Sequence, residues 1–294
     1  VGHMNIGAGR VVYQPLELIN KAIKDERFFK NKMILEVLEH VKKNNSKLHV
    51  MGLLSNGGVH SHINHLFALI DMLEQNKVKN VCYHLFLDGR DVNPKSSYTF
   101  IKALEDKINK NGIGKIVTIS GRYYAMDRDN NYDRLIKAYD AIVYNDGPKF
   151  NTAKEAVEKS YDEGITDEFI IPSVISNGKL EDNDGVITFN FRPDRLRELF
   201  TAITNPKESP METKQFNNLS VLTMMPVVNT VLCNHAFNHQ DLSETMGLYL
   251  SQNNLNQLRI AETEKYAHVT YFYDGGKEES YPGMKKILIP SPKV

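Results

Sequence analysis

The segment Leu48–Leu73 reads LHVMGLLSNGGVHSHINHLFALIDML, and it decides the fold. Its first seven residues form a short and almost wholly apolar run, which is typical of a strand buried on both faces of a sheet. Polar residues and glycines follow at positions 55–62. From Ile63 onward, apolar residues recur at every third or fourth position, which predicts a helix. The segment is therefore a strand, a loop and a helix, the unit from which parallel sheets are built.

The same unit recurs along the chain. Further strands are predicted at Val81–Leu87, Lys115–Ser120, Gly185–Phe191 and Leu219–Val228. Helical patterns follow the first three of these runs and begin at Asn93-Pro94, Tyr132 and Leu196. Because strands and helices alternate through short loops, we expect an α/β domain with a mainly parallel sheet and helices on both faces.

The two ends of the chain do not fit this repeating unit. Residues 1–13 are rich in glycine, and residues 236–294 are expected to hold a helix, a strand and a hairpin-like region around Asp274-Gly275-Gly276. We therefore expect residues 14–235 to form an α/β domain inserted into a second domain. The segments 1–13 and 236–294 would be parts of that second domain.

The composition excludes some classes of partner. Hydrophobic residues make up 41% of the chain and charged residues 24%, as in ordinary globular proteins. Lysine plus arginine equals aspartate plus glutamate at 36 each, so nothing indicates a nucleic acid or an acidic membrane as a partner. No apolar run reaches the ~18–20 residues that cross a bilayer. Cys82 and Cys233 are expected to be buried free thiols in a reducing compartment, and the cytoplasm is the expected location.

Cationic side chains stand in the loops where the predicted strands end. They are His60, Arg90, Arg122, Arg128, Arg192 and Arg195. Ligands of parallel sheets bind at the edge where the carboxyl ends of the strands meet, so we expect these groups to converge there. Converging guanidinium groups repel one another unless an anion joins them, and each can grip a carboxylate or phosphate through two parallel hydrogen bonds. The sequence thus predicts a site for a small, multiply charged anion such as a phosphorylated acid.

Asp91 adds a carboxylate to this group of cations. A neighbouring arginine would keep it ionised and suited to accepting a proton from a hydroxyl. The alternative is that Asp91 forms a salt bridge or caps its own loop.

The run His60-Ser61-His62-Ile63-Asn64-His65 allows a different interpretation. Its HxHxxH spacing resembles the HxHxDH run of metallo-β-lactamase-like hydrolases, which would make the protein a zinc hydrolase. However, Asn64 stands in the place of the aspartate. A further alternative is a stand-alone module that binds a small anion and performs no chemistry.

Longer motifs resemble one family. In chain order they are VGHMNIGAGR (1–10), GLLSNGGVHSH (52–62), FLDGRD (86–91), SGRYYAMDR (120–128), NFRPDR (190–195) and LRIAETEKY (258–266). Together they resemble the cofactor-independent phosphoglycerate mutases of the alkaline phosphatase superfamily, with Asn56 where that family usually has aspartate. The resemblance extends over essentially the whole chain.

The resemblance implies an activity and a set of site residues. It implies that the complete enzyme interconverts 3-phosphoglycerate and 2-phosphoglycerate through a phosphoserine, with two divalent ions (most often manganese) and without bisphosphoglycerate. It also implies a monomer whose inserted domain orients the glycerate. The positions that match substrate contacts are His60, Arg90, Asp91, Arg122, Arg128, Arg192, Arg195 and Lys265, with Asp91 transferring the hydroxyl proton.

The same resemblance places some functional groups outside this sequence. The nucleophilic serine would lie just before Val1, and the aspartate and histidine metal ligands would lie before residue 1 or after Val294. We therefore expect the 294 residues to be a piece of a longer protein, with no metal site of their own and no turnover by themselves.

Overall fold

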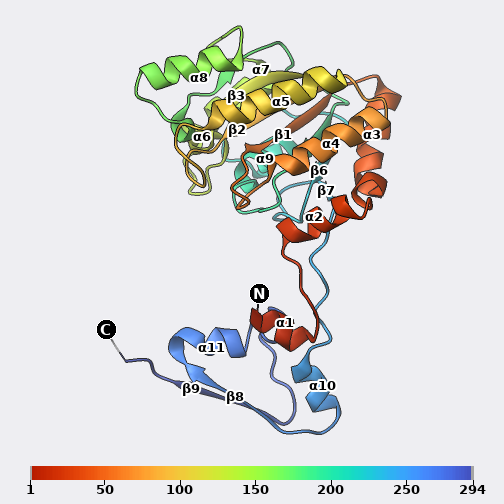
Figure 1. Cartoon of the computed structure of the whole chain (residues 1–294), viewed down its shortest axis with the longest axis vertical. Helices are drawn as coiled ribbons and strands as arrows, with labels where there is room; N and C mark the ends of the chain where they lie inside the picture. The colour runs from red at the N-terminus through yellow and green to blue at the C-terminus, as the bar shows by residue number, and fades with distance from the viewer. Residues whose placement is uncertain (1, 293–294) are drawn as a thin grey trace. The chain divides into compact units, whose positions relative to one another are not determined.

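The repeating strand–loop–helix unit folds into one seven-stranded sheet (Figure 1). The computed structural model describes residues 2–292. In sheet order, the strands are β4 (Ser173–Val174), β3 (Lys115–Gly121), β2 (Val81–Leu87), β1 (Leu48–Leu54), β5 (Gly185–Thr188), β6 (Ser220–Thr223) and β7 (Asn234–His235). Neighbouring strands are parallel except β3 and β4, which are antiparallel. The expected α/β fold with a mainly parallel sheet is confirmed.

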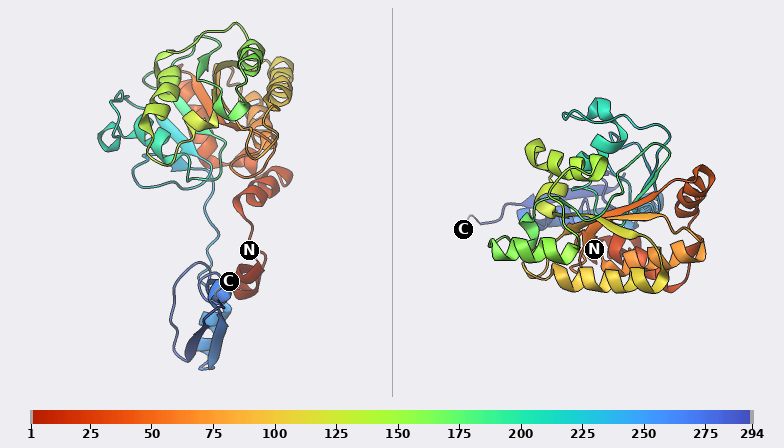
Figure 2. Two further views of the ribbon diagram at one scale, coloured as in Figure 1. Left: turned by 90° about the vertical axis from the view of Figure 1, so that its left-hand side faces the viewer. Right: turned by 90° about the horizontal axis from the view of Figure 1, so that it is seen from above.

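Helices cover both faces of the sheet, also as expected (Figure 2). One face carries α3 (Lys32–Asn44), α4 (Ile63–Gln75), α5 (Ser97–Asn111) and α8 (Ala153–Asp162). The other face carries α7 (Tyr132–Tyr144) and α9 (Arg197–Thr204). Helix α2 (Pro15–Lys24) and the 3₁₀ turn η1 (Phe28–Lys30) precede α3, and a second such turn, η3 (Pro206–Glu208), follows α9.

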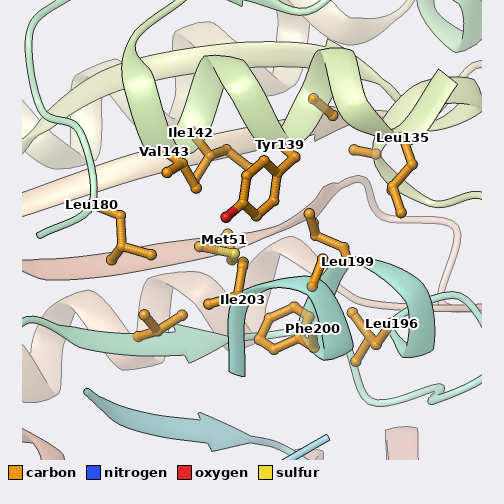
Figure 3. Packing of buried hydrophobic residues seen from close by; sticks show 14 of the residues in the cluster. Met51, Leu135, Tyr139, Ile142, Val143, Leu180, Leu196, Leu199, Phe200 and Ile203 are labelled. Carbon is orange, nitrogen blue, oxygen red and sulfur yellow. The ribbon is translucent and has the colours of Figure 1, made fainter. Parts of the chain in front are cut away.

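An apolar cluster holds α7 and α9 against the sheet (Figure 3). Met51 of β1 belongs to this cluster together with Tyr139 of α7 and Ile203 of α9, and all three are almost completely buried. Burying an apolar side chain of this size contributes about 1.5–3 kcal/mol. This packing holds α7 and α9 in place on the sheet. It therefore also restricts the positions of the two loops that lead into these helices.

The winding of the sheet reverses between β1 and β5. Strands β1, β2 and β3 follow one another toward one edge, whereas β5, β6 and β7 follow one another toward the opposite edge. In open sheets of this kind, ligands bind beyond the carboxyl ends of the strands at this reversal. The loop after β1 contains His60 and the loop after β5 contains Arg192, so two predicted site residues stand at this point of the sheet.

Residues 2–17 and 239–292 form a separate compact unit, distinct from residues 18–238. The smaller unit contains α1 (Gly2–Ala8), α10 (Met246–Gln252), β8 (Gln257–Glu262), α11 (Thr263–Val269) and β9 (Met284–Ile289). The hairpin expected around residues 274–276 is wrong, because β8 and β9 pair in parallel and α11 lies on the connection between them. Residues 1, 293 and 294 of the expected end segments lie outside the described residues. Assignment of this unit to a phosphatase-like domain stays a prediction.

The start of α5 differs from the prediction. It begins at Ser97, three residues after Pro94. Asn93 forms a turn instead, since its Oδ1 accepts the backbone N–H of Lys95 at 3.0 Å. The helix is capped from a distance by Asp167, whose Oδ2 accepts the N–H groups of Ser96 and Ser97 at 2.8 and 2.9 Å.

Two other observations concern the whole of the described chain. Within residues 2–292, no helix combines the length and the apolar character needed to cross a membrane. Both cysteines are free, with Cys82 buried as expected and Cys233 only half-buried.

Candidate functional site

Four neighbouring loops meet at the carboxyl edge of the sheet. They follow β3, β2, β1 and β5, which are consecutive in the sheet order. These loops carry the predicted site residues of the larger unit: Arg122 and Arg128 after β3, Arg90 and Asp91 after β2, His60 after β1, and Arg192 and Arg195 after β5. Strand order thus brings together residues that are up to 135 positions apart, between His60 and Arg195.

Arg122 is buried between two carboxylates. It begins the short helix α6 (Arg122–Ala125), and its side chain is only 2% exposed. Its Nη1 donates to Oδ1 of Asp88 at 2.7 Å and to Oδ2 of Asp91 at 2.6 Å. Burial alone would lower the pKa of Arg122, but the hydrogen bonds to Asp91 and Asp88 raise it overall. The guanidinium is therefore charged and fixed in place.

Asp88 also organises the loop after β2. Its Oδ1 accepts the backbone N–H groups of Arg90 and Asp91 at 3.2 and 3.0 Å, in addition to the bond from Arg122. Burial favours the neutral carboxyl group, but hydrogen bonds from Ser55, Asp91 and Arg122 lower the pKa of Asp88 below its ordinary value. One ionised carboxylate thus ties two loops together.

A second carboxylate, Asp194, joins residues of two loops and lies close to a third. Its oxygens accept hydrogen bonds from Nε and Nη2 of Arg192 at 2.9 and 3.0 Å, and from Nη1 of Arg128 at 2.9 Å. Its Oδ1 lies 3.8 Å from Nδ1 of His60. Burial favours the neutral carboxyl group, but the hydrogen bonds from Arg192 and Arg128 lower the pKa of Asp194 below its ordinary value.

His60 is buried beneath this cluster and is 3% exposed. Its carbonyl oxygen accepts the backbone N–H groups of Phe191 at 2.8 Å and Arg192 at 3.3 Å, which ties the loop after β1 to the loop after β5. Its Nδ1 has no hydrogen-bond partner among the described residues. Burial, followed by the positive charge of Arg122, lowers the pKa of His60 to about 4, so the imidazole is neutral near pH 7.

Three of the predicted arginines line one cavity of about 230 Å³. These are Arg90, Arg122 and Arg195. Nη1 of Arg195 donates to the carbonyl oxygen of Met126 at 2.8 Å. Burial, followed by the positive charges of Arg122, Arg128 and Arg90, lowers the pKa of Arg195. The cavity has room for a small ligand, and its lining is mixed in charge, because Asp127, Asp129 and Glu168 share it with the arginines.

Sequence reasoning gave no role to several residues that shape the site. Asp88 and Asp194 stand inside the quoted motifs, so their position in the chain was the available signal. Glu168 has no such signal, because it lies in the 3₁₀ turn η2 (Asp167–Phe169), outside the quoted motifs. Its Oε1 lies 3.5 Å from Nη1 of Arg90. Arg134 also lines the cavity and stacks 4.0 Å from the ring centre of Tyr123. Carboxylates of the chain therefore relieve part of the repulsion between the arginines, and the expectation that only a bound anion does so is wrong.

Comparison with known proteins identifies the family. A family model described as the N-terminus of BPG-independent PGAM matches residues 19–227, which is most of the chain. The chain belongs to this family. Curated relatives named 2,3-bisphosphoglycerate-independent phosphoglycerate mutase support the assignment. The one from Clostridium perfringens (strain SM101 / Type A) is 48% identical over 300 residues, and the one from Staphylococcus aureus (strain COL) is 48% identical over 296 residues.

The chain spans 58% and 59% of the length of these relatives, which in turn match 100% of it. Among solved structures, a phosphoglycerate mutase from Leishmania mexicana, crystallised at low cobalt concentration, matches the whole chain with a TM-score of 0.75. It is 30% identical, and the match covers 57% of that protein. Similarity in sequence and in fold therefore agree on the family.

Lys265 is the one predicted site residue in the smaller unit. It lies on α11 and is exposed. Its role in binding substrate stays a prediction, as do the roles of the seven residues in the larger unit.

The histidines of the HxHxxH run do not share a ligand position. Nε2 of His65 lies 2.8 Å from Oδ1 of Asn20, and the side chain of His62 caps α4 by accepting the N–H of Asn64. Across the part of the chain that the structure describes, no group of three or more histidine, cysteine, aspartate or glutamate residues is placed to hold a metal ion. The zinc hydrolase interpretation finds no support here. The resemblance places the ligands of its manganese ions outside these 294 residues, so the two divalent ions stay a prediction.

Proposed function

We propose that this chain provides the substrate-orienting part of an enzyme that interconverts 3-phosphoglycerate and 2-phosphoglycerate, as in glycolysis and gluconeogenesis. Membership of the family and the names of the relatives support the reaction. The observation that carries the proposal is the gathering of five arginines from three loops at the carboxyl edge of the sheet. The carboxylate and the phosphate of a phosphoglycerate could each accept hydrogen bonds from the N–H groups of these arginines.

The proposed division of labour follows from the contacts. Arg90, Arg122 and Arg195 line the cavity and would bind one anionic group of the ligand, while Arg128 and Arg192 would bind the other. His60 is neutral near pH 7, so it can donate or accept a hydrogen bond from a glycerate hydroxyl without adding charge. Lys265 would add a further cationic contact.

In the proposed reaction, a serine of the complete enzyme accepts the phosphoryl group and glycerate turns within the arginine cluster. Asp91 then takes the proton of the attacking glycerate hydroxyl while the oxygen of that hydroxyl bonds to phosphorus. The bond between phosphorus and the serine oxygen breaks, and the serine oxygen regains a proton. The contact that supports this role is the hydrogen bond from Nη1 of Arg122 to Oδ2 of Asp91 at 2.6 Å. The divalent ions that the resemblance implies, most often manganese, would be held by residues outside this sequence and would stabilise negative charge on the phosphoryl group.

Replacing the arginines tests the proposal. In the full-length protein, Arg192→Ala and Arg128→Ala should each lower kcat/KM for 3-phosphoglycerate at least about a hundredfold, since each removes charge-assisted hydrogen bonds to the ligand. Conversion to 2-phosphoglycerate is followed directly by phosphorus NMR. Arg27→Ala is the matched control, because Arg27 is an exposed arginine of the same unit that pairs only with Asp25 among the described residues. Wild-type rates in both site variants would refute the assignment.

We further propose a monomer in the cytoplasm whose only partner is the small-molecule substrate. The proposal includes no nucleic-acid or membrane partner, because the positive and negative residues of the chain are equal in number. The competing hypothesis of a binding module without chemistry predicts tight binding of 3-phosphoglycerate and no conversion, so the same NMR experiment distinguishes the two.

A further inference from the structure

Asp194 joins two loops of the site, those after β3 and β5, and lies close to His60 of a third. It accepts two hydrogen bonds from Arg192, one from Arg128, and lies 3.8 Å from Nδ1 of His60. Among the described residues, no other carboxylate pairs with two of the candidate arginines. Arg128 and Arg192 are otherwise long, half-exposed side chains, with 43% and 44% of their surface accessible.

The geometry of these bonds leaves part of each guanidinium available. Arg192 contacts Asp194 through Nε and Nη2, which form one edge of the planar group. Arg128 contacts it through Nη1 alone. A guanidinium has five N–H donors in a rigid plane, so fixing one edge also fixes the direction of the others. Asp194 therefore sets where the remaining N–H groups of Arg192 point, and it holds Arg128 at one nitrogen.

We propose that Asp194 is a positioning residue that orders Arg128 and Arg192 before the ligand arrives, so that their free N–H groups converge on one anionic group. The identity of that ligand, a phosphoglycerate, rests on the proposed function. The positioning itself rests on the contacts of Asp194. Ordering two long side chains before binding should raise the affinity for the ligand about tenfold, because binding then no longer has to immobilise them.

A competing role is physically distinct. Asp194 is itself an anion, and it could occupy the position that the ligand needs. In that case the ligand would have to displace it, and removing its charge would strengthen binding. The proposal requires the opposite sign, because loss of the carboxylate frees both arginines to move.

The test compares Asp194→Asn with Asp133→Asn in the full-length protein. Asp133 is an exposed carboxylate of the same unit and takes part in none of these contacts. We expect Asp194→Asn to raise both the Kd and the KM for 3-phosphoglycerate about tenfold with a much smaller change in kcat, and Asp133→Asn to change neither. A purely structural role would lower the melting temperature and leave Kd and KM of the folded protein unchanged, which would overturn the proposal. Tighter binding would also overturn it.

A second measurement needs no activity and no foldable variant. In nitrogen-15 NMR spectra of the wild-type chain, the Nε–H of Arg192 should exchange slowly with water, because Asp194 holds it. The Nε–H of Arg90, which the described residues do not bond, should exchange quickly. Equal, fast exchange at both would contradict the proposal.

The two proposals can fail separately. If the wild-type protein converts no phosphoglycerate but Asp194→Asn still weakens binding of 3-phosphoglycerate, the proposed function fails and the positioning role stands. If the wild type converts substrate and Asp194→Asn leaves Kd and KM unchanged, the positioning role fails and the proposed function stands.

Discussion

Replacing Asp88 by alanine should destabilise the larger unit by about 3 kcal/mol. Asp88 and Arg122 are 1% and 2% exposed at their side chains, so water cannot replace the lost partner. Removing one member of a buried ion pair costs about 3–5 kcal/mol. The lower end applies here because Asp91 still pairs with Arg122 at 2.6 Å. The loss of the two backbone hydrogen bonds to Asp88 adds to the cost.

The isosteric variant separates charge from hydrogen bonding. In Asp88→Asn, the amide oxygen can still accept the N–H groups of Arg90 and Asp91, and only the charge is lost. We expect a cost of about 1–2 kcal/mol, the difference between a charged and a neutral acceptor. Because the pKa of Asp88 is lowered in the folded state, its contribution is complete above about pH 4 and disappears as the pH falls through the folded-state value.

Urea unfolding followed by far-UV circular dichroism measures these differences, and thermal unfolding gives an independent value. For a unit of about 220 residues, 3 kcal/mol corresponds to a fall in Tm of about 6–12 °C. Asp133→Asn serves as the control for removing one exposed negative charge. If Asp88→Ala stays within about 1 kcal/mol of the wild type at pH 7, Asp88 does not stabilise the site through buried bonds.

Two more predictions concern stability. Burial lowers the pKa of both His49 and His84, so near pH 6.5 these histidines bind protons in the unfolded chain but not in the folded chain. The free energy of unfolding should therefore be constant above pH 7 and fall below pH 6.5 by up to about 1.4 kcal/mol per pH unit for each histidine. Urea titrations from pH 7.5 to 5.5 measure this, and a flat profile would contradict it. Gly89→Ala should cost about 1–3 kcal/mol more than Gly112→Ala. Both glycines have φ of 64°, but only at Gly89 would a Cβ lie 2.8 Å from a backbone atom, the nitrogen of Glu168; equal urea midpoints would refute the close approach.

The central strands could be predicted from sequence because their apolar runs are as long as the strands. The runs at Leu48–Leu54 and Val81–Leu87 match β1 and β2 at both ends. The prediction for β5 was too long, because the chain leaves the ladder after Thr188 while it remains apolar. There, the side chain of Asn190 takes over by accepting the N–H of Leu53 at 2.8 Å. A side chain that replaces a strand partner leaves no periodic signal.

The cations of the candidate site could be predicted, but their carboxylate partners could not. Arginines directly after strands must lie at one edge of the sheet, whichever way the sheet is ordered. The pairing of Asp194 with Arg128 joins residues 66 positions apart, and it depends on β3 and β5 lying on either side of β1 and β2. That order follows from the reversal of winding, which local sequence patterns do not encode.

The balance of charge limits how this site can attract an anion. With Arg134, six arginines face six carboxylates (Asp88, Asp91, Asp127, Asp129, Asp194 and Glu168), and His60 is neutral, so the charges of the cluster sum to zero. Long-range attraction of a multiply charged ligand is therefore weak, and it is screened further by salt. Affinity must come from N–H groups that the carboxylates hold in fixed directions. Such a site selects ligands by the spacing of their anionic groups rather than by their total charge.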